Sequence, residues 1–282
     1  MRTLEYGAVR LAIASVALCP PLARVYIQLL DRAVPRLRRT AEKNLHLAGL
    51  AADGTVDGMF RSIARMLEMF ARLPRITREN VHHLIRYDGL ENFKNALAGG
   101  RGVLVATAHF GNWELSAFAH ALMTAPMHIV VRPLDNARLD AFVEQRRALS
   151  GNRIISKRDA AREILRALKG GEAVGILIDQ NTAIEEGVFV DFFGTKACAG
   201  SGFVKLAQHS GAPVVPGYAL WSEDERKYIL RFDPEIPMTG DVLTDTQRIH
   251  AHLENVIRRH ADQYLWIHRR WKTRPPGEPP LY

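Results

Sequence analysis

The chain of 282 residues has 47% hydrophobic side chains, enough to bury one large core, so its composition excludes an intrinsically disordered protein. Its two cysteines, Cys19 and Cys198, lie far apart and offer neither a disulfide framework nor a metal cluster, which is typical of a reducing compartment. The net charge is +8, and the positive charge is concentrated near both ends of the chain. Residues 1–40 contain seven arginines and two acidic residues, and residues 258–272 contain five basic residues and one acidic residue. This distribution is typical of proteins that bind an anionic membrane surface or nucleic acid.

The N-terminal segment is the first element with a distinctive pattern. Residues 8–30 are largely apolar, but two arginines and the Pro20-Pro21 pair interrupt them, so no run of about 18 to 20 apolar residues is available to span a bilayer. A cleavable signal peptide is a poor fit as well, because no clear cleavage site of small residues is present. We expect residues 1–36 to form a membrane-associating helical region with apolar and arginine-rich faces, ahead of a single domain over residues 37–282. An ordinary amphipathic helix packed on that domain is the alternative, and both can hold at once.

Strands alternate with helices along the rest of the chain. Helical periodicity marks residues 55–73 and a short helix at 89–97. The expected strands cover residues 102–108, 127–131, 153–156, 173–178, 213–219 and 228–232, and the expected helices cover residues 113–123, 135–148, 159–168, 203–209 and 243–262. This alternation predicts an α/β domain with a mainly parallel, mixed sheet flanked by helices.

The most informative stretch is residues 109–114, with the sequence His-Phe-Gly-Asn-Trp-Glu, directly after an apolar strand. On one helix His109 and Glu114 would lie about 140° apart, so they can meet only if His109 precedes the helix. Gly111 and Asn112 supply a sharp turn and a helix N-cap there. His109 is then left on the loop between strand and helix, where α/β folds place catalytic groups, and the layout is that of a general base and a carboxylate in an acyl-transfer site.

Plainer explanations compete with this one. A carboxylate in the first turn of a helix is stabilised by the helix dipole alone, and a single histidine near a core strand is commonly a structural residue. A zinc site is not indicated, because the chain lacks two histidines four residues apart beside a glutamate. His250 and His252 are only two apart and face different sides of a helix.

Two further groups of polar side chains follow expected strands. Arg132 is able to bind phosphate or stabilise an oxyanion, while Asp135 and Asn136 are suited to cap the next helix. Asp179 emerges from an apolar strand, where its charge needs a partner, with Arg132 and His109 as the candidates. Since loops at strand ends share one edge of such a sheet, these side chains are expected to gather there.

Aromatic residues mark a third segment. Residues 187–194 are expected to form a loop that carries Phe189, Phe192 and Phe193. These rings are suited to line an apolar groove for an acyl chain, and packing in the core explains them equally well.

Four segments share a distinctive order and spacing. They are His109-Phe-Gly-Asn-Trp-Glu114, Arg132-Pro-Leu-Asp-Asn136, Asp179-Gln180 with Gly187, Phe189 and Phe192-Phe-Gly194, and Tyr264-Leu-Trp-Ile-His-Arg-Arg-Trp-Lys272. From about residue 38 to residue 275 the chain resembles the lipid A biosynthesis (late) acyltransferase family, one of the glycerolipid acyltransferases with a His-x4-Asp/Glu signature. That family includes relatives that acylate mannosylated phosphatidylinositol. The interrupted N-terminal apolar segment departs from the family's usual pattern and puts single-pass anchoring in doubt.

The resemblance implies transfer of a fatty acyl group from an acyl-carrier-protein or coenzyme A thioester to a hydroxyl of a membrane glycolipid, with a lipid A precursor as the expected acceptor. His109 would be the general base, and Glu114 would orient it. Arg132 would bind an acceptor phosphate or the developing oxyanion, and Asp179 would hold Arg132 or the acceptor. The family's direct mechanism implies no metal, no other cofactor and no covalent enzyme intermediate, and the chain contains no Gly-x-Ser-x-Gly elbow.

The other substrate-binding residues expected from the resemblance are Gln180, Phe189, Arg269 and Arg270, of which the two arginines would meet lipid phosphates. The expected location is the cytoplasmic face of the bacterial inner membrane, with peripheral or shallow attachment. Other acceptors, such as a mannosylated phosphatidylinositol or a lysophospholipid, remain open, as do a thioesterase and a non-catalytic lipid-binding protein. No nucleic-acid partner is expected, because the basic residues are not interleaved with aromatic side chains on which bases could stack.

Overall fold

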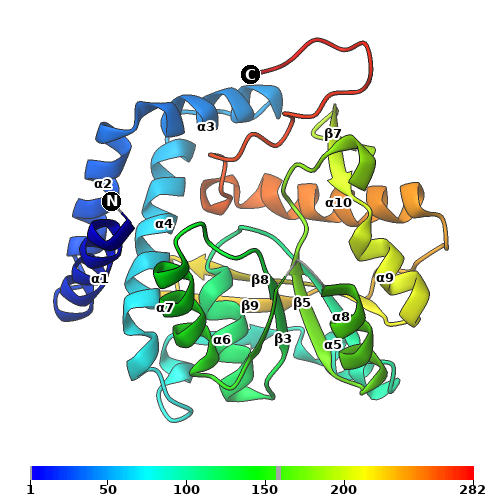
Figure 1. The fold of residues 1–282 in the computed structure, drawn as a ribbon, viewed down its shortest axis with the longest axis horizontal. Helices are drawn as coiled ribbons and strands as arrows, with labels where there is room; N and C mark the ends of the chain where they lie inside the picture. Colours follow the sequence, from blue (N-terminus) through cyan, green and yellow to red (C-terminus); the bar gives the residue numbers. More distant parts are fainter. Residues whose placement is uncertain (1, 157–159) are drawn as a thin grey trace.

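The computed structural model describes residues 2–156 and 160–282. Within these ranges seven strands form the main sheet: β1 (Ile85–Asp88), β2 (Val103–Thr107), β3 (His128–Val131), β4 (Arg153–Ser156), β5 (Ala173–Leu177), β8 (Val214–Ser222) and β9 (Lys227–Phe232). Their order across the sheet is β1-β9-β8-β2-β5-β3-β4 (Figure 1). Neighbouring strands are parallel except β8 and β9, so the expected mainly parallel, mixed sheet is confirmed.

Helices cover both faces of this sheet. In the described part of the chain they are α1 (Arg2–Leu18), α2 (Leu22–Ala33), α3 (Pro35–Leu47), α4 (Thr55–Arg72), α5 (Leu90–Ala98), α6 (Trp113–Met123), α7 (Ala137–Ala148), α8 (Ala160–Lys169), α9 (Gly202–Ser210) and α10 (Val242–Arg259). Along β2, Val103 and Val105 pack in the core cluster that includes α5 and α6, whereas Leu104 and Ala106 pack with α8 and α9. Because both faces of β2 are buried, its sequence is a continuous apolar run without alternation.

Several elements differ from the sequence-based expectation. The short strand β1 was not expected, and the expected loop at 187–194 is instead the beginning of an antiparallel hairpin of β6 (Gly187–Phe192) and β7 (Thr195–Gly200). Its tight turn holds Phe193 and Gly194 at positive φ, 55° and 74°, and a phenylalanine there lacks the Asn-Gly signature by which such turns are predicted. The helix expected from residue 159 is described from Ala160 onward, since Asp159 lies outside the described residues.

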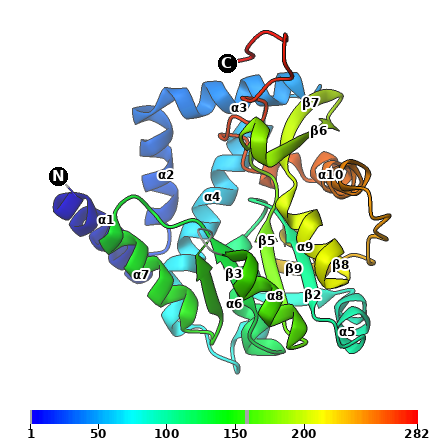
Figure 2. The same cartoon turned by 45° about the vertical axis from the view of Figure 1, so that its right-hand side comes forward.

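The N-terminal helices lie at one side of the molecule, where α1 and α2 pack along α4 and α1 also meets α7 (Figures 1 and 2). Ile13 and Val16 point inward from α1 and are buried. Leu4, Leu11 and Leu18 point outward and are each more than 70% exposed. In the described part of the chain, no helix is long and apolar enough to cross a membrane. The structure therefore shows α1 packed on the domain along one side, and membrane association remains a proposal.

A buried amide joins the N-terminal helices to the C-terminal segment, which lies beside α3 in Figure 1. Asn44 of α3 is completely buried, and its Nδ2 donates to the carbonyl oxygens of Trp266 at 2.5 Å and His268 at 2.7 Å. The hydroxyl of Tyr282 donates to the Oδ1 of the same side chain. One amide thus fixes three points of a segment that lies more than 200 residues later in the chain.

We predict that Asn44→Ala lowers the free energy of unfolding by about 2 kcal/mol or more, because it leaves buried carbonyl groups without their donor. Denaturant unfolding followed by circular dichroism measures the change. Asn95→Ala, on the exposed face of α5, is the matched control and should change stability by no more than about 0.5 kcal/mol. Equal stability of the two variants would contradict the role assigned to Asn44.

Candidate active site

The register of two neighbouring strands brings His109 and Asp179 together. β2 and β5 run parallel with Thr107 opposite Leu177, and each of the two polar residues comes two positions after its strand partner. The carboxyl ends of parallel strands meet at one edge of the sheet, which is where α/β folds bind ligands. Of the two partners that the sequence left open for Asp179, the structure gives His109.

Two hydrogen bonds hold this pair. His109 Nδ1 lies 3.0 Å from Asp179 Oδ1, and the backbone N–H of His109 donates to Asp179 Oδ2 at 3.1 Å. The Asp179 side chain is only 3% exposed, so these bonds compensate for taking its charge out of water. The imidazole is 20% exposed and lines an open groove, so its ring remains accessible to a substrate.

The charges around the pair shift both pKa values. Burial lowers the pKa of His109, but the charge and hydrogen bond of Asp179, with a smaller effect from Glu114, outweigh burial and raise it above its usual value. Burial raises the pKa of Asp179, but the charge and hydrogen bonds of His109 outweigh burial and lower it. A carboxylate that faces Nδ1 favours the tautomer with the proton there, which leaves Nε2 as the basic nitrogen.

The turn after His109 has the form that the sequence predicts. Gly111 adopts a φ of 59°, and a Cβ at this position would collide with the carbonyl oxygen of Ala219 on β8. Asn112 is the N-cap of α6, since its Oδ1 accepts from the backbone N–H of Leu115 at 3.0 Å. Glycine and the cap together keep His109 on the loop and place the next residues in a helix.

Glu114 has a different partner from the one expected. Its two carboxylate oxygens accept hydrogen bonds from Arg147 Nε at 2.9 Å and Nη2 at 2.5 Å. The Nδ1 of His109 is engaged by Asp179 instead, so Asp179 is the residue placed to orient the imidazole, and Glu114 acts on it through its charge alone. The sequence pattern missed this pairing because Arg147 lies at the end of α7, 33 residues after Glu114.

The groove in front of His109 has a volume of about 950 Å³. Arg132, Asp135, Gln180 and Lys205 line it, and the amide nitrogen of Gln180 lies 3.5 Å from His109 Nε2. Glu185 and Glu186 line the groove as well, so its charge is mixed, and Arg132 and Lys205 are the side chains suited to contact an anionic, hydroxyl-bearing molecule beside the imidazole.

Of the three phenylalanines that the sequence left open between an acyl groove and the core, two lie in the core. Phe192 and Phe193 are buried against Trp271 and Trp266. Phe189, on the same hairpin, is not among the residues that line the groove. The explanation by core packing therefore holds for Phe192 and Phe193, and contact of Phe189 with an acyl chain stays a prediction.

The two C-terminal arginines differ from each other. Arg270 is only 2% exposed and donates from Nη1 to the carbonyl oxygen of Cys198 at 2.7 Å, with its guanidinium over the ring of Phe192. This burial contradicts a direct contact of Arg270 with a lipid phosphate. Arg269 is exposed but lies over the ring of Tyr282 and does not line the groove, so its contact with phosphate stays a prediction.

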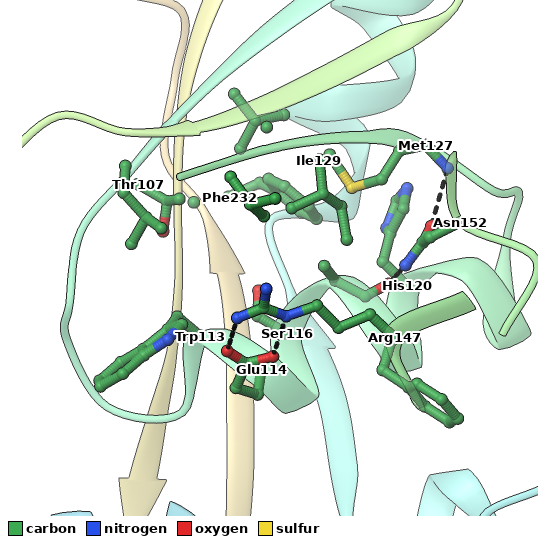
Figure 3. A pocket seen from close by; sticks show the side chains of 17 residues that line it. Thr107, Trp113, Glu114, Ser116, His120, Met127, Ile129, Arg147, Asn152 and Phe232 are labelled. Atoms are coloured by element: carbon green, nitrogen blue, oxygen red, sulfur yellow. Dashed lines mark hydrogen bonds and ion pairs between the residues drawn. The ribbon is translucent and has the colours of Figure 1, made fainter. Parts of the chain in front are cut away.

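A second hollow, which the sequence did not predict, lies between α6 and the sheet and is shown in Figure 3. It is narrow, with a volume of about 60 Å³, and most of its lining side chains are apolar. Trp113, Val131, Arg147 and Leu177 line both this cavity and the groove, so the two hollows are neighbours separated by these shared side chains. The ring centroids of His109 and Trp113 are 5.1 Å apart.

Comparison with known proteins gives this geometry a context. Residues 15–273 match the family described as bacterial lipid A biosynthesis acyltransferase. The chain belongs to this family. This match confirms the family that the sequence motifs indicate.

Characterised members of the lipid A acyltransferase family show how far the similarity extends. The chain is 36% identical over 200 residues to the lipid A biosynthesis palmitoleoyltransferase of Escherichia coli K12 and 32% identical over 197 residues to the lauroyltransferase of the same strain. Each of these matches covers 69% of this chain and 64% of the relative, so the chain spans less than two thirds of their length. The myristoyltransferase of that strain is 25% identical over 279 residues, which cover 95% of this chain and 86% of the relative.

We predict that Asp179→Asn lowers the pKa of His109, because it removes the negative charge that raises it while burial continues to lower it. NMR titration of the His109 ring, assigned by its absence in a His109→Gln variant, measures this change. Asp191→Asn, which removes an exposed carboxylate on β6, should leave the titration unchanged. An unaltered His109 pKa in Asp179→Asn would rule out the electrostatic coupling.

Proposed function

We propose that this protein transfers a fatty acyl chain from a thioester to a hydroxyl group of a lipid A precursor. The observation that carries the proposal is a histidine whose Nδ1 is held by a buried carboxylate while its ring lines an open groove. This is the arrangement that a general base needs. Membership of the lipid A acyltransferase family and the names of its characterised members support the same reaction.

In the proposed reaction His109 Nε2 removes the proton of the acceptor hydroxyl as its oxygen attacks the thioester carbonyl. A carbon–oxygen bond forms, the carbon–sulfur bond breaks, and the imidazolium returns its proton to the departing thiolate. Asp179 stabilises the imidazolium, which exists only between the two proton transfers. Proton and electron pairs balance without a covalent enzyme intermediate, metal or other cofactor.

The groove supplies the substrate contacts. Arg132 and Lys205 are placed to bind an acceptor phosphate, and Arg132 is also suited to stabilise the developing oxyanion. Gln180, close to His109 Nε2, is suited to hold the attacking hydroxyl. We propose acyl-carrier protein or coenzyme A as the carrier of the thioester, and a mannosylated phosphatidylinositol or a lysophospholipid as the alternative acceptors.

We expect His109→Ala to lower the rate of acyl transfer by at least about 10²-fold, the range typical of a lost general base. Purified protein is incubated with an acyl thioester and an underacylated lipid A preparation, and the products are separated by mass spectrometry. His82→Ala removes an exposed histidine outside the groove and should retain the wild-type rate. Near-normal turnover by His109→Ala would end the proposal, and thioester hydrolysis that does not need the acceptor would favour a thioesterase.

We further propose that α1 and α2 rest in an anionic membrane surface, on the cytoplasmic face of the inner membrane. Leu4, Leu11 and Leu18 recur every seven residues, so they form one exposed apolar stripe along α1. The opposite side of α1 is apolar as well and packs on the domain. A helix that is apolar on both sides is suited to contact protein on one side and lipid on the other.

Basic residues accompany this apolar stripe. A hollow of about 400 Å³ at α2 and α4 is lined by Arg24, Arg32, Arg38 and Arg61. Arg38 is neutralised by Asp31 and Asp57, which leaves the other three arginines available for lipid headgroups. Each basic residue close to an anionic surface adds about 1 kcal/mol of attraction.

We predict that the double substitution Leu11→Ser and Leu18→Ser weakens binding to vesicles of anionic phospholipid by at least about tenfold, because it removes apolar area that would enter the interface. Sedimentation of the protein with vesicles measures the effect. Leu243→Ser is the control, since Leu243 is likewise an exposed leucine but lies at the start of α10. Unchanged vesicle binding by the double variant would exclude α1 from the interface.

A further inference from the structure

The C-terminal segment, residues 263–273, contacts the loop that carries the site histidine. The backbone N–H of Leu265 donates to the carbonyl oxygen of His109 at 3.0 Å. The backbone N–H of Gly111 donates to the carbonyl oxygen of Gln263 at 2.9 Å. The loop after β2 is therefore held by backbone hydrogen bonds from the far end of the chain.

The same segment holds the loop that follows Asp179. Nε2 of His268 accepts from the backbone N–H of Asn181 at 2.9 Å, and the Asn181 side chain exchanges two hydrogen bonds of 2.9 Å with Thr273. The hydroxyl of Thr273 donates to the carbonyl oxygen of Thr182 at 2.8 Å. One segment thus joins the loops that leave β2 and β5, so it helps to fix the distance between the two residues of the site.

Arg270 brings a buried positive charge into this segment. Besides its bond to the carbonyl oxygen of Cys198, its Nη1 lies 3.4 Å from the carbonyl oxygen of Gln180, the residue next to Asp179. Its Nε and Nη2 are buried without a hydrogen-bond partner among the described residues. Taking a cation out of water costs free energy unless a charge close by compensates it, so the position of Arg270 requires an anion.

Asp179 is the anion that fits. Burial lowers the pKa of the Arg270 guanidinium, and four groups close to it act in the opposite direction. They are Tyr264, Asp179, Cys198 and Tyr282. Burial raises the pKa of both tyrosines and of the thiol, so these three groups are neutral near pH 7. Of the four, Asp179 alone carries a negative charge, because its pKa is lowered.

Other titratable groups face Asp179 from the elements packed around it. They are Tyr218 of β8, His250 of α10, and Tyr264 and His268 of the C-terminal segment. Burial raises the pKa of both tyrosines and lowers that of both histidines, to about 4 for His250, so these groups are uncharged near pH 7. Around His109 the further charges are those of Glu114 and Arg147, which form an ion pair with each other. Arg270 is therefore placed to supply the charge that balances Asp179.

Asp179 needs this charge most before the reaction begins. In the proposed mechanism His109 starts neutral, so its imidazole offers a hydrogen bond but no compensating charge. A buried carboxylate in this position can take up a proton itself, or it can retain a proton on the imidazole. The first change removes the charge that stabilises the imidazolium, and the second leaves the base already occupied. A fixed cation disfavours both.

We propose that Arg270 is a positioning residue of the reaction, whose buried charge keeps Asp179 ionised beside a neutral imidazole and so leaves His109 free to accept a proton. This inference rests on the proposed acyl transfer. Arg270 does not line the groove, so it acts through Asp179 and not by contact with the substrate.

The test compares Arg270→Met and Arg270→Gln, which are neutral, with Arg270→Lys, which keeps the charge. Loss of the cation favours the imidazolium, so the pKa of His109 should rise by about half a unit or more in both neutral variants. NMR titration of the His109 ring measures this rise. The acid limb of the pH profile of kcat/KM should move to higher pH by the same amount, while KM changes little. Arg270→Lys should keep the wild-type titration and profile.

Arg146→Met is the matched control. Arg146 of α7 also donates to backbone carbonyl oxygens and lies over an aromatic ring, 4.7 Å from that of Phe142, but it does not line the groove. This variant should keep the wild-type titration of His109. If the wild type transfers acyl chains and the neutral variants of Arg270 leave both the titration and the pH profile unchanged, the inference is wrong while the proposed function stands.

A double-mutant cycle with Asp179→Asn covers variants that are too unstable for the kinetic measurement. Arg270→Met should lower the melting temperature less when Asp179 is already neutral, because no buried anion is then left uncompensated. Equal losses in the two backgrounds would overturn the inference. If the wild type transfers no acyl chain, the proposed function fails, whereas the NMR titration and the cycle still test the charge of Arg270.

Discussion

The parallel pairing of β2 with β5 is the constraint on which the rest of the site depends. Thr107 lies opposite Leu177, and this register alone determines that His109 and Asp179 leave the sheet side by side. The same two strands direct alternate residues toward α6 and so form part of the cavity wall. A slip of one residue would reverse every side chain, so the site for the reacting groups and the cavity below it depend on one set of backbone hydrogen bonds.

The sequence motif predicts that Glu114 orients His109, but the structure gives this position to Asp179 and pairs Glu114 with Arg147. Asp179 is buried and supports the imidazole, while Glu114 neutralises Arg147 where the apolar cavity opens. Glu114 therefore compensates the charge of Arg147, and the charge of Asp179 is stabilised by its two hydrogen bonds with His109. Glu114 still contributes to the basicity of His109 through its charge.

Features that depend on residues close together in the sequence could be predicted, whereas contacts between distant elements could not. The turn at Gly111 and the cap at Asn112 depend on neighbouring residues, and the alternation of strands and helices gave the sheet class. The partner of Glu114 could not be predicted, because it depends on how α7 packs. The cavity could not be predicted either, because Gly175 leaves space there only when its strand faces α6. Burial of Arg270 was missed because a pair of arginines beside aromatic residues resembles an exposed basic patch.

The hydrogen bonds of the Asn44 side chain constrain the order in which parts of the chain fold. Asn181 lines the groove, and its backbone N–H donates to Nε2 of His268, whose own carbonyl oxygen accepts from Asn44 of α3. The buried side chain of α3 therefore forms its hydrogen bonds with residues that lie more than 200 positions later in the chain. Contacts of such high sequence separation form late, because loop closure is costly in entropy. A chain in which residues 264–282 have not yet left the ribosome lacks these contacts, so we expect the segment beside the groove to be fixed only after they emerge.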